Sequence, residues 1–175
     1  MKSEGALKVL ITGAEIALVT KRLGAAITRD YRNKNPLLVG ILKGSFVFLA
    51  DLVRQLNFPL EVDFVRLASY GAGTTTSGKV KMAHDLQLNV KGRHVLVVED
   101  IIDTGITVNF LMDYLKKQKP ASLKLCALTD KPSRRRVKVK IDYRGIEVPD
   151  KFLVGYGLDC DEKHRNLPDI CILDE

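Results

Sequence analysis

Hydrophobic residues follow two different spacings along the first two thirds of the chain, and the two spacings predict different elements. One set recurs with the spacing of a single helical face, at Ile16, Val19, Leu23 and Ile27. Thr12 and Glu15 precede this set at the spacing of a capping box, so we predict a helix over 13–31. Residues 37–42 form an unbroken apolar run, which is typical of a strand buried on both faces.

The same patterns place further elements along the chain. We predict helices over 45–56 and 108–117, strands over 60–67, 94–98 and 123–128, and short strands at 80–82, 86–88, 152–154 and 170–172. Because strands alternate with helices, we expect an α/β fold with a parallel sheet flanked by helices. Residues 129–140 are basic and predict a loop. Residues 69–79 are small, polar and glycine-rich, and long loops of this kind in compact domains are often functional.

Composition narrows the class of protein. A chain of 175 residues with 46% hydrophobic residues suits one packed domain over 1–175. No apolar run approaches the roughly 20 residues of a membrane helix, and the first residues lack the apolar stretch of a secretory signal. The three cysteines are too widely spaced for a Cys-x-x-Cys pair, so we expect a reduced, cytoplasmic setting.

The net charge of +7 indicates an anionic partner. Nucleic acid, nucleotides and phosphate-rich small molecules all satisfy this condition, and charge alone does not choose among them.

Residues 95–107 carry the strongest functional signal. A buried strand leads into Glu99 and Asp100, and Asp103 then precedes a Thr-Gly-x-Thr turn that opens a helix. Ligands of open α/β sheets bind at the carboxyl ends of the strands, and a helix N-terminus favours phosphate. In this turn Gly105 allows close backbone approach, and its two threonines, 104 and 107, add hydroxyl donors.

Carboxylates do not suit a phosphate group, so those in this segment indicate that the ligand has another part as well. Glu99 and Asp100 could accept hydrogen bonds from a ribose diol, or hold magnesium through water. Asp103 stands beside the phosphate turn, within reach of a base on that ribose. The plain alternative is a capped strand-turn-helix joint, which three carboxylates and two threonines within nine positions disfavour. The chain has no G-x-x-x-x-G-K-[ST] motif.

This segment resembles the phosphoribosyl-pyrophosphate motif of type I phosphoribosyltransferases, and its Glu-Asp-Ile-Ile-Asp-Thr-Gly form is similar to that of the hypoxanthine-guanine phosphoribosyltransferases. The resemblance covers about 37–173. Its other elements are Leu42-Lys43-Gly44, Ser69-Tyr70-Gly71, Asp130-Lys131-Pro132, Phe152-Leu153-Val154-Gly155-Tyr156, Leu158-Asp159 and Arg165.

The resemblance implies a twisted parallel sheet as the core, over about 37–145, with a small hood built from the N-terminal and C-terminal segments. It also implies Mg²⁺ as cofactor. Phosphoribosyl pyrophosphate and a 6-oxopurine would be the substrates, with pyrophosphate as a product. A homodimer or homotetramer is implied as well.

Site residues follow from the same resemblance. Asp103 would be the general base near purine N7. Phosphoribosyl pyrophosphate would be held by Lys43, Gly44, Glu99, Asp100, Asp103, Thr104, Gly105, Ile106, Thr107 and Arg165. Lys43 and Gly44 would bind its pyrophosphate group, with an unusual cis peptide there. Magnesium would meet Asp159, Glu99 and Asp100. Ser69 and Tyr70 would belong to a mobile loop that closes over the reacting centre.

Three residues would bind the purine: Lys131, Phe152 and Leu153. Lys131 presents only donors, so it fits the 6-oxo acceptor of hypoxanthine or guanine and opposes the amino group of adenine. From spacing alone Lys131 is one more solvated charge beside 134–136, and Phe152 is a core residue. The family motifs around Lys131 and Phe152 instead favour purine-binding roles for both residues.

Two other readings stay open. One is an RNA-binding regulator built on the same fold, which the charge and the run Arg134-Arg135-Arg136 permit. This run is short and has no interleaved aromatic residues for base stacking, so we expect no nucleic-acid partner. The other is a related transferase that acts on xanthine, adenine or a pyrimidine. Lys131 and Phe152 oppose adenine, whereas xanthine differs from guanine only at C2.

Overall fold

The structure is a computed structural model, and it describes residues 6–69 and 80–174. Of the expected mobile loop, Ser69 ends strand β3, whereas Tyr70 lies outside the described residues.

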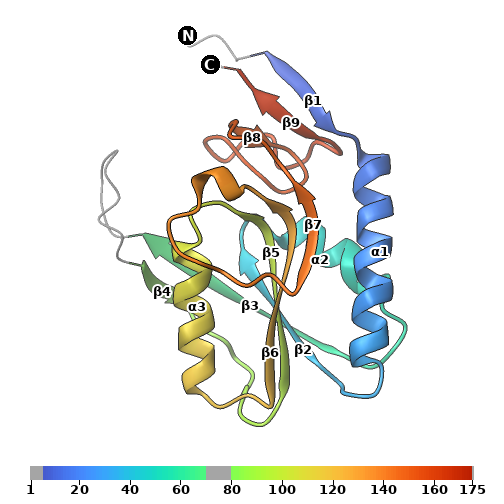
Figure 1. Cartoon of the computed structure of the whole chain (residues 1–175), viewed down its shortest axis with the longest axis vertical. Helices are drawn as coiled ribbons and strands as arrows, with labels where there is room; N and C mark the ends of the chain where they lie inside the picture. Colours follow the sequence, from blue (N-terminus) through green and yellow to red (C-terminus); the bar gives the residue numbers. More distant parts are fainter. Residues whose placement is uncertain (1–5, 70–79, 175) are drawn as a thin grey trace.

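The larger of two sheets has six strands and forms the centre of the molecule (Figure 1). Its order is β4 (Val80–His84), β3 (Glu61–Ser69), β2 (Leu37–Leu42), β5 (His94–Ile102), β6 (Ser122–Asp130) and β7 (Tyr143–Glu147). All neighbouring pairs are parallel except β3 with β4. The predicted α/β class with a parallel sheet is therefore confirmed.

Side chains of alternate strand positions pack on opposite faces of this sheet. In β5, Leu96 and Val98 join the core beneath α1 (Gly13–Tyr31) and α2 (Phe46–Val53). Val95 and Val97 join a second core beneath α3 (Ile106–Lys117). Figure 1 shows α1 and α3 on opposite sides of the strands. Because both faces are covered, the strands carry the continuous apolar runs seen in the sequence.

The smaller sheet is the hood that the sequence predicted from the two terminal segments. It is antiparallel, in the order β1 (Leu7–Ile11), β9 (Ile170–Leu173) and β8 (Leu153–Val154). Figure 1 shows it above the six-stranded sheet, with β1 and β9 side by side. Gly13 N–H donates to Asp169 Oδ1 at 2.7 Å, which ties the start of α1 to the hood.

Several predicted elements are confirmed closely. The helix over 13–31 and the strand over 37–42 have the predicted bounds, and the capping box joins Thr12 and Glu15. Cys126 and Cys171 are buried free thiols. No helix in the described part of the chain is long and apolar enough to cross a bilayer.

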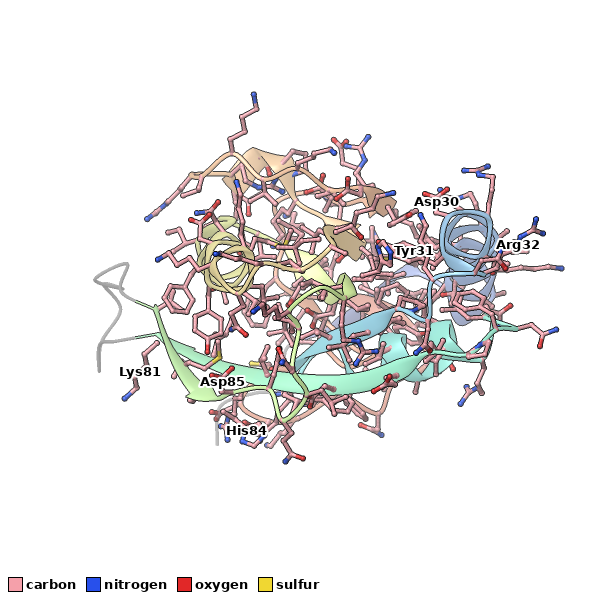
Figure 2. The ribbon with its side chains drawn as sticks, turned by 90° about the horizontal axis from the view of Figure 1, so that it is seen from below. Asp30, Tyr31, Arg32, Lys81, His84 and Asp85 are labelled. Carbon is pink, nitrogen blue, oxygen red and sulfur yellow. The ribbon has the colours of Figure 1, made fainter. Side chains whose placement is uncertain are left out.

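Other predictions were wrong, and the structure gives reasons. Residues 86–88 form no strand, because the backbone amides of Gln87 and Leu88 donate to Asp63 Oδ2 at 2.8 and 2.9 Å. Figure 2 shows Lys81 and His84 on β4 and Asp85 just beyond its end, where this turn begins. Strands β1 and β7 were not predicted.

The predicted start of the basic loop over 129–140 is also too early. Thr129 and Asp130 belong to β6, and 132–134 form one turn of 3-10 helix.

Candidate functional site

A cavity of about 840 Å³ lies where the carboxyl ends of β2, β5 and β6 face the hood. Ten of the predicted site residues line it: Lys43, Gly44, Glu99, Asp100, Asp103, Lys131, Phe152, Leu153, Asp159 and Arg165. These residues come from segments spread over more than 120 positions of the chain. The fold therefore gathers at one sheet edge the groups that the sequence shows only as separate motifs.

A smaller cavity of about 140 Å³ adjoins the first at the N-terminus of α3. Glu99 and Asp103 line both cavities, and Thr104, Gly105 and Thr107 line the smaller one. Ile106 is the first residue of α3 and lines neither.

The turn before α3 leaves backbone amides available for a ligand. Gly105 occupies the N-cap position with φ of +83°, a conformation that favours glycine. Within the described residues no side chain caps this helix, and Thr104 Oγ1 reaches the amide of Ile106 only at 3.4 Å. Uncapped amides at a helix N-terminus attract an anion.

Arg135 supports this turn from behind. Its Nε donates to Asp103 O at 3.0 Å and its Nη2 to Ile102 O at 3.3 Å, while the guanidinium is paired with Asp130. A Cβ at Gly105 would come within 3.0 Å of Arg135 and closer to Val137. The basic segment after β6 thus fixes the backbone of the turn.

Glu99 and Asp100 form a buried acidic pair at the end of β5. Burial raises the pKa of both carboxyls, and the neighbouring Asp100 raises that of Glu99 further. Among the described residues, Glu99 Oε2 is buried without a hydrogen-bond partner. Such a pair favours a ligand that brings positive charge or donor hydrogens, such as a hard cation or hydroxyl groups.

These carboxylates fit a magnesium site only in part. The described residues contain no group of three His, Cys, Asp or Glu side chains placed to hold a metal ion by themselves. Asp159 lies across the cavity and pairs with Arg165 at 2.9 Å. Mg²⁺ commonly keeps water and substrate phosphate oxygens and takes one or two carboxylates, so the oxygen donors here suit it in that mode.

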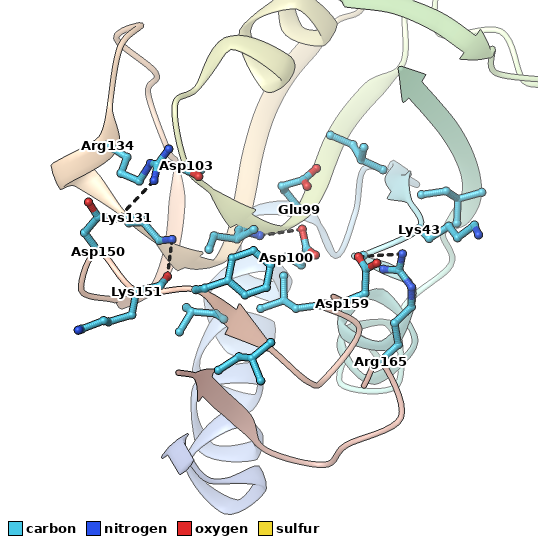
Figure 3. A pocket seen from close by; sticks show the side chains of 18 of the residues that line it. Lys43, Glu99, Asp100, Asp103, Lys131, Arg134, Asp150, Lys151, Asp159 and Arg165 are labelled. Carbon is cyan, nitrogen blue, oxygen red and sulfur yellow. Dashed lines mark hydrogen bonds and ion pairs between the residues drawn. The ribbon is translucent and has the colours of Figure 1, made fainter. Parts of the chain in front are cut away.

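Asp103 faces an arginine that sequence analysis did not assign to the site. Arg134 Nε lies 3.2 Å from Asp103 Oδ1, and Arg134 Nη1 lies 3.6 Å from Asp150 Oδ1. Figure 3 shows this trio at one end of the cavity, beside Lys131. A carboxylate in this position can accept a proton from a ligand.

Lys131 is buried rather than solvated, with 6% of its surface exposed. Its Nζ donates to the carbonyl oxygen of Lys151 at 2.8 Å (Figure 3). Phe152, which follows Lys151 in the chain, is half exposed and lines the same cavity, whereas Leu153 is buried in β8. One ammonium group and one aromatic face are therefore presented side by side to a ligand.

Lys43 and Gly44 follow β2 at the opposite end of the cavity. The peptide bond between Leu42 and Lys43 is cis, as the resemblance implied. A Cβ at position 44 would collide with the Asp100 carboxylate, so the close approach of these two segments requires glycine.

A second residue missing from the prediction, Glu162, lies beside Lys43. Lys43 Nζ is 2.9 Å from Glu162 Oε2, and Arg165 Nη2 is 3.2 Å from the same oxygen. Arg165 Nη1 also donates to Gly157 O at 2.8 Å. Glu162 is exposed and follows no strand, so its position gave no signal in the sequence.

An anion-binding turn, a buried acidic pair and opposed cationic groups at the carboxyl edge of a parallel sheet define the class of protein. They are the features of an α/β enzyme that binds a phosphorylated sugar or nucleotide.

Comparison with known proteins agrees with this class. Residues 10–161 match the model of the phosphoribosyl transferase domain family. The chain is 49% identical over 162 residues to a hypoxanthine phosphoribosyltransferase of Haemophilus influenzae, covering 91% of this chain and 90% of that protein. It is 47% identical over 166 residues to a hypoxanthine-guanine phosphoribosyltransferase of Bacillus subtilis, covering 95% and 92%.

Solved structures show the same likeness. A crystal structure of a hypoxanthine-guanine phosphoribosyltransferase from Bacillus anthracis matches with a TM-score of 0.91 and 45% identity, covering 97% of this chain and 100% of that one. The chain belongs to the phosphoribosyltransferase family, among the hypoxanthine and hypoxanthine-guanine phosphoribosyltransferases, and it is a transferase.

Proposed function

We propose that the chain transfers the 5-phosphoribosyl group of phosphoribosyl pyrophosphate to N9 of hypoxanthine or guanine. The products are IMP or GMP and pyrophosphate, and the role is purine salvage. The observation that carries this proposal is the pair of adjoining cavities, which together are lined by the turn at 104–107, the acidic pair, the buried Lys131, and the cations Lys43 and Arg165.

The donor would lie along the edge of the sheet. Its 5′-phosphate would bind the uncapped amides and hydroxyls of 104–107, and its ribose hydroxyls would donate to Glu99 and Asp100. Its pyrophosphate would meet Lys43, Gly44 and Arg165 at the far end. The spacing of these groups supports one extended, doubly phosphorylated ligand.

Magnesium would be held by Glu99, Asp100 and Asp159 together with water and phosphate oxygens. When bound, it would offset the negative charge that grows on the pyrophosphate group. The protein's own cations at that end, Lys43 and Arg165, would act in the same direction.

The purine would stack on Phe152, with its 6-oxo group accepting a hydrogen bond from Lys131. Leu153 would offer backbone groups. Asp103 would act as the general base, taking or sharing the N7 proton and so raising the nucleophilicity of N9. The Arg134 guanidinium beside it would hold the carboxylate in place.

The surroundings of the basic run speak against the RNA-binding alternative. Arg134 pairs with Asp103 and Asp150, and Arg135 is mostly buried against Asp130. Two of the three arginines are thus engaged by partners in or behind the site. We further propose a cytoplasmic homodimer or homotetramer, in line with the three free cysteines and the family resemblance.

The test is a product assay of the purified chain with phosphoribosyl pyrophosphate, Mg²⁺ and each of hypoxanthine, guanine, xanthine and adenine. We expect IMP and GMP, and little product from adenine. No nucleotide from either hypoxanthine or guanine would refute the proposal, whereas a dominant product from xanthine would favour that alternative.

A further inference from the structure

Glu162 is the only residue in the described part of the chain that is paired with both Lys43 and Arg165. Its Oε2 lies 2.9 Å from Lys43 Nζ and 3.2 Å from Arg165 Nη2. A single carboxylate oxygen therefore bridges the two cations that line the same end of the cavity. This oxygen accepts a hydrogen bond from each of the two cations.

The backbone holds Glu162 in this position. Cys160 and Lys163 exchange two backbone hydrogen bonds, of 3.2 and 3.0 Å, across a two-residue turn. Both turn residues, Asp161 and Glu162, have positive φ, of 55° and 64°, which is uncommon for residues other than glycine. The amide of Glu162 also donates to Asp159 Oδ2 at 2.9 Å.

The cations retain capacity for a further anion. Among the described residues, Arg165 Nε is buried without an acceptor, although both of its Nη atoms are engaged. Lys43 has three donor hydrogens and a half-exposed side chain. Glu162 itself is 63% exposed and does not line the cavity, so it can swing away into solvent.

We propose that Glu162 is an internal counter-anion, which occupies Lys43 and Arg165 in the free enzyme and is displaced when a pyrophosphate group binds there. This inference rests on the proposed function, because it takes these two cations as the pyrophosphate site. Glu162 competes with the ligand for the same charges, so it weakens binding of the donor and of free pyrophosphate and speeds release of the product.

The size of the effect follows from the exposure of the pairs. Exposed ion pairs are weak because water screens them, and two such pairs must be given up. Glu162→Gln should therefore bind pyrophosphate about two- to thirtyfold more tightly. Asp161→Asn is the matched control, because it removes one negative charge from the adjacent turn position, where no ion pair with either cation is seen.

The experiment is calorimetric titration of the full chain with inorganic pyrophosphate in the presence of Mg²⁺. Glu162→Gln should lower the Kd as stated and lower the KM for phosphoribosyl pyrophosphate more than that for hypoxanthine, with an unchanged Tm. Asp161→Asn should change the Kd less than twofold. In a Lys43→Met background, the gain from Glu162→Gln should shrink.

An unchanged or higher Kd in Glu162→Gln would overturn the inference, as would an equal gain in Asp161→Asn. These outcomes differ from a failure of the proposed function. That failure would appear as no binding of pyrophosphate and no nucleotide product with the wild-type chain, and it would remove this inference as well.

Discussion

Replacing Lys131 with Met keeps the length of the side chain but removes its ammonium group. In the structure this group is buried and donates to the Lys151 carbonyl at 2.8 Å, next to the exposed ring of Phe152. The substitution leaves the 6-oxo oxygen of a bound purine facing a methyl group. It also leaves the Lys151 carbonyl without its donor.

The cost can be worked out from these contacts. A buried acceptor that loses its hydrogen bond costs about 1–3 kcal/mol, so kcat/KM for hypoxanthine and guanine should fall about 5- to 150-fold. Adenine presents an amino donor at the same position, so its kcat/KM should stay unchanged or rise. The lost bond to Lys151 should lower the Tm by about 2–8 °C.

The assay is steady-state kinetics with hypoxanthine, guanine and adenine at saturating phosphoribosyl pyrophosphate. Lys151→Met is the matched control, because it removes a lysine side chain from the same cavity but keeps the carbonyl that Lys131 contacts. The control should retain the preference for 6-oxopurines. An equal loss of kcat/KM across all three bases in Lys131→Met would refute the assignment of Lys131 to the 6-oxo group.

Three further outcomes are expected. Asp103→Asn should lower kcat about 10²- to 10⁴-fold with little change in the Kd of phosphoribosyl pyrophosphate, and an unchanged kcat would remove Asp103 as the base. Gly44→Ala should raise the KM for phosphoribosyl pyrophosphate about 5- to 150-fold, because a Cβ there collides with Asp100; a normal KM would contradict this. The raised pKa values of Glu99 and Asp100 mean that the folded state binds more protons than the unfolded state, so stability falls as pH rises above the ordinary carboxyl range. Thermal melts should therefore show that Glu99→Gln raises the Tm of the ligand-free protein more at pH 8 than at pH 5, and an equal increase would count against the buried acidic pair.

Elements that are specified by neighbouring residues in the sequence could be predicted from it. The helix over 13–31 has a capping box and one apolar face, and the strand over 37–42 is apolar throughout, so both were predicted with the observed bounds. Strand β1 exists because it pairs with β9, about 160 residues away, and most of its residues are exposed. Residues 86–88 failed as a strand because Asp63, distant in sequence, takes their amides.

The candidate site likewise has residues that the sequence predicted and residues that it did not. The acidic pair at 99–100 and the turn at 104–107 lie within nine positions of the sequence, and the structure places them along two adjoining cavities. Arg135 and Glu162 act on the site through contacts with residues 32 and 119 positions away, and no local spacing marks either of them. Arg134 was visible only as part of a charge run, which suggested a surface patch before its partners were known.

The pairing of β1 with β9 has a consequence for how the protein matures. The central sheet and its three helices lie within residues 13–147, so their contacts can form while later residues are still being synthesised. One wall of the cavity, including Leu173 and Asp174, is in place only when the strand at 170–173 docks against the strand at 7–11. A nascent chain can thus be largely folded and still have no working site, which delays activity until these late residues have emerged.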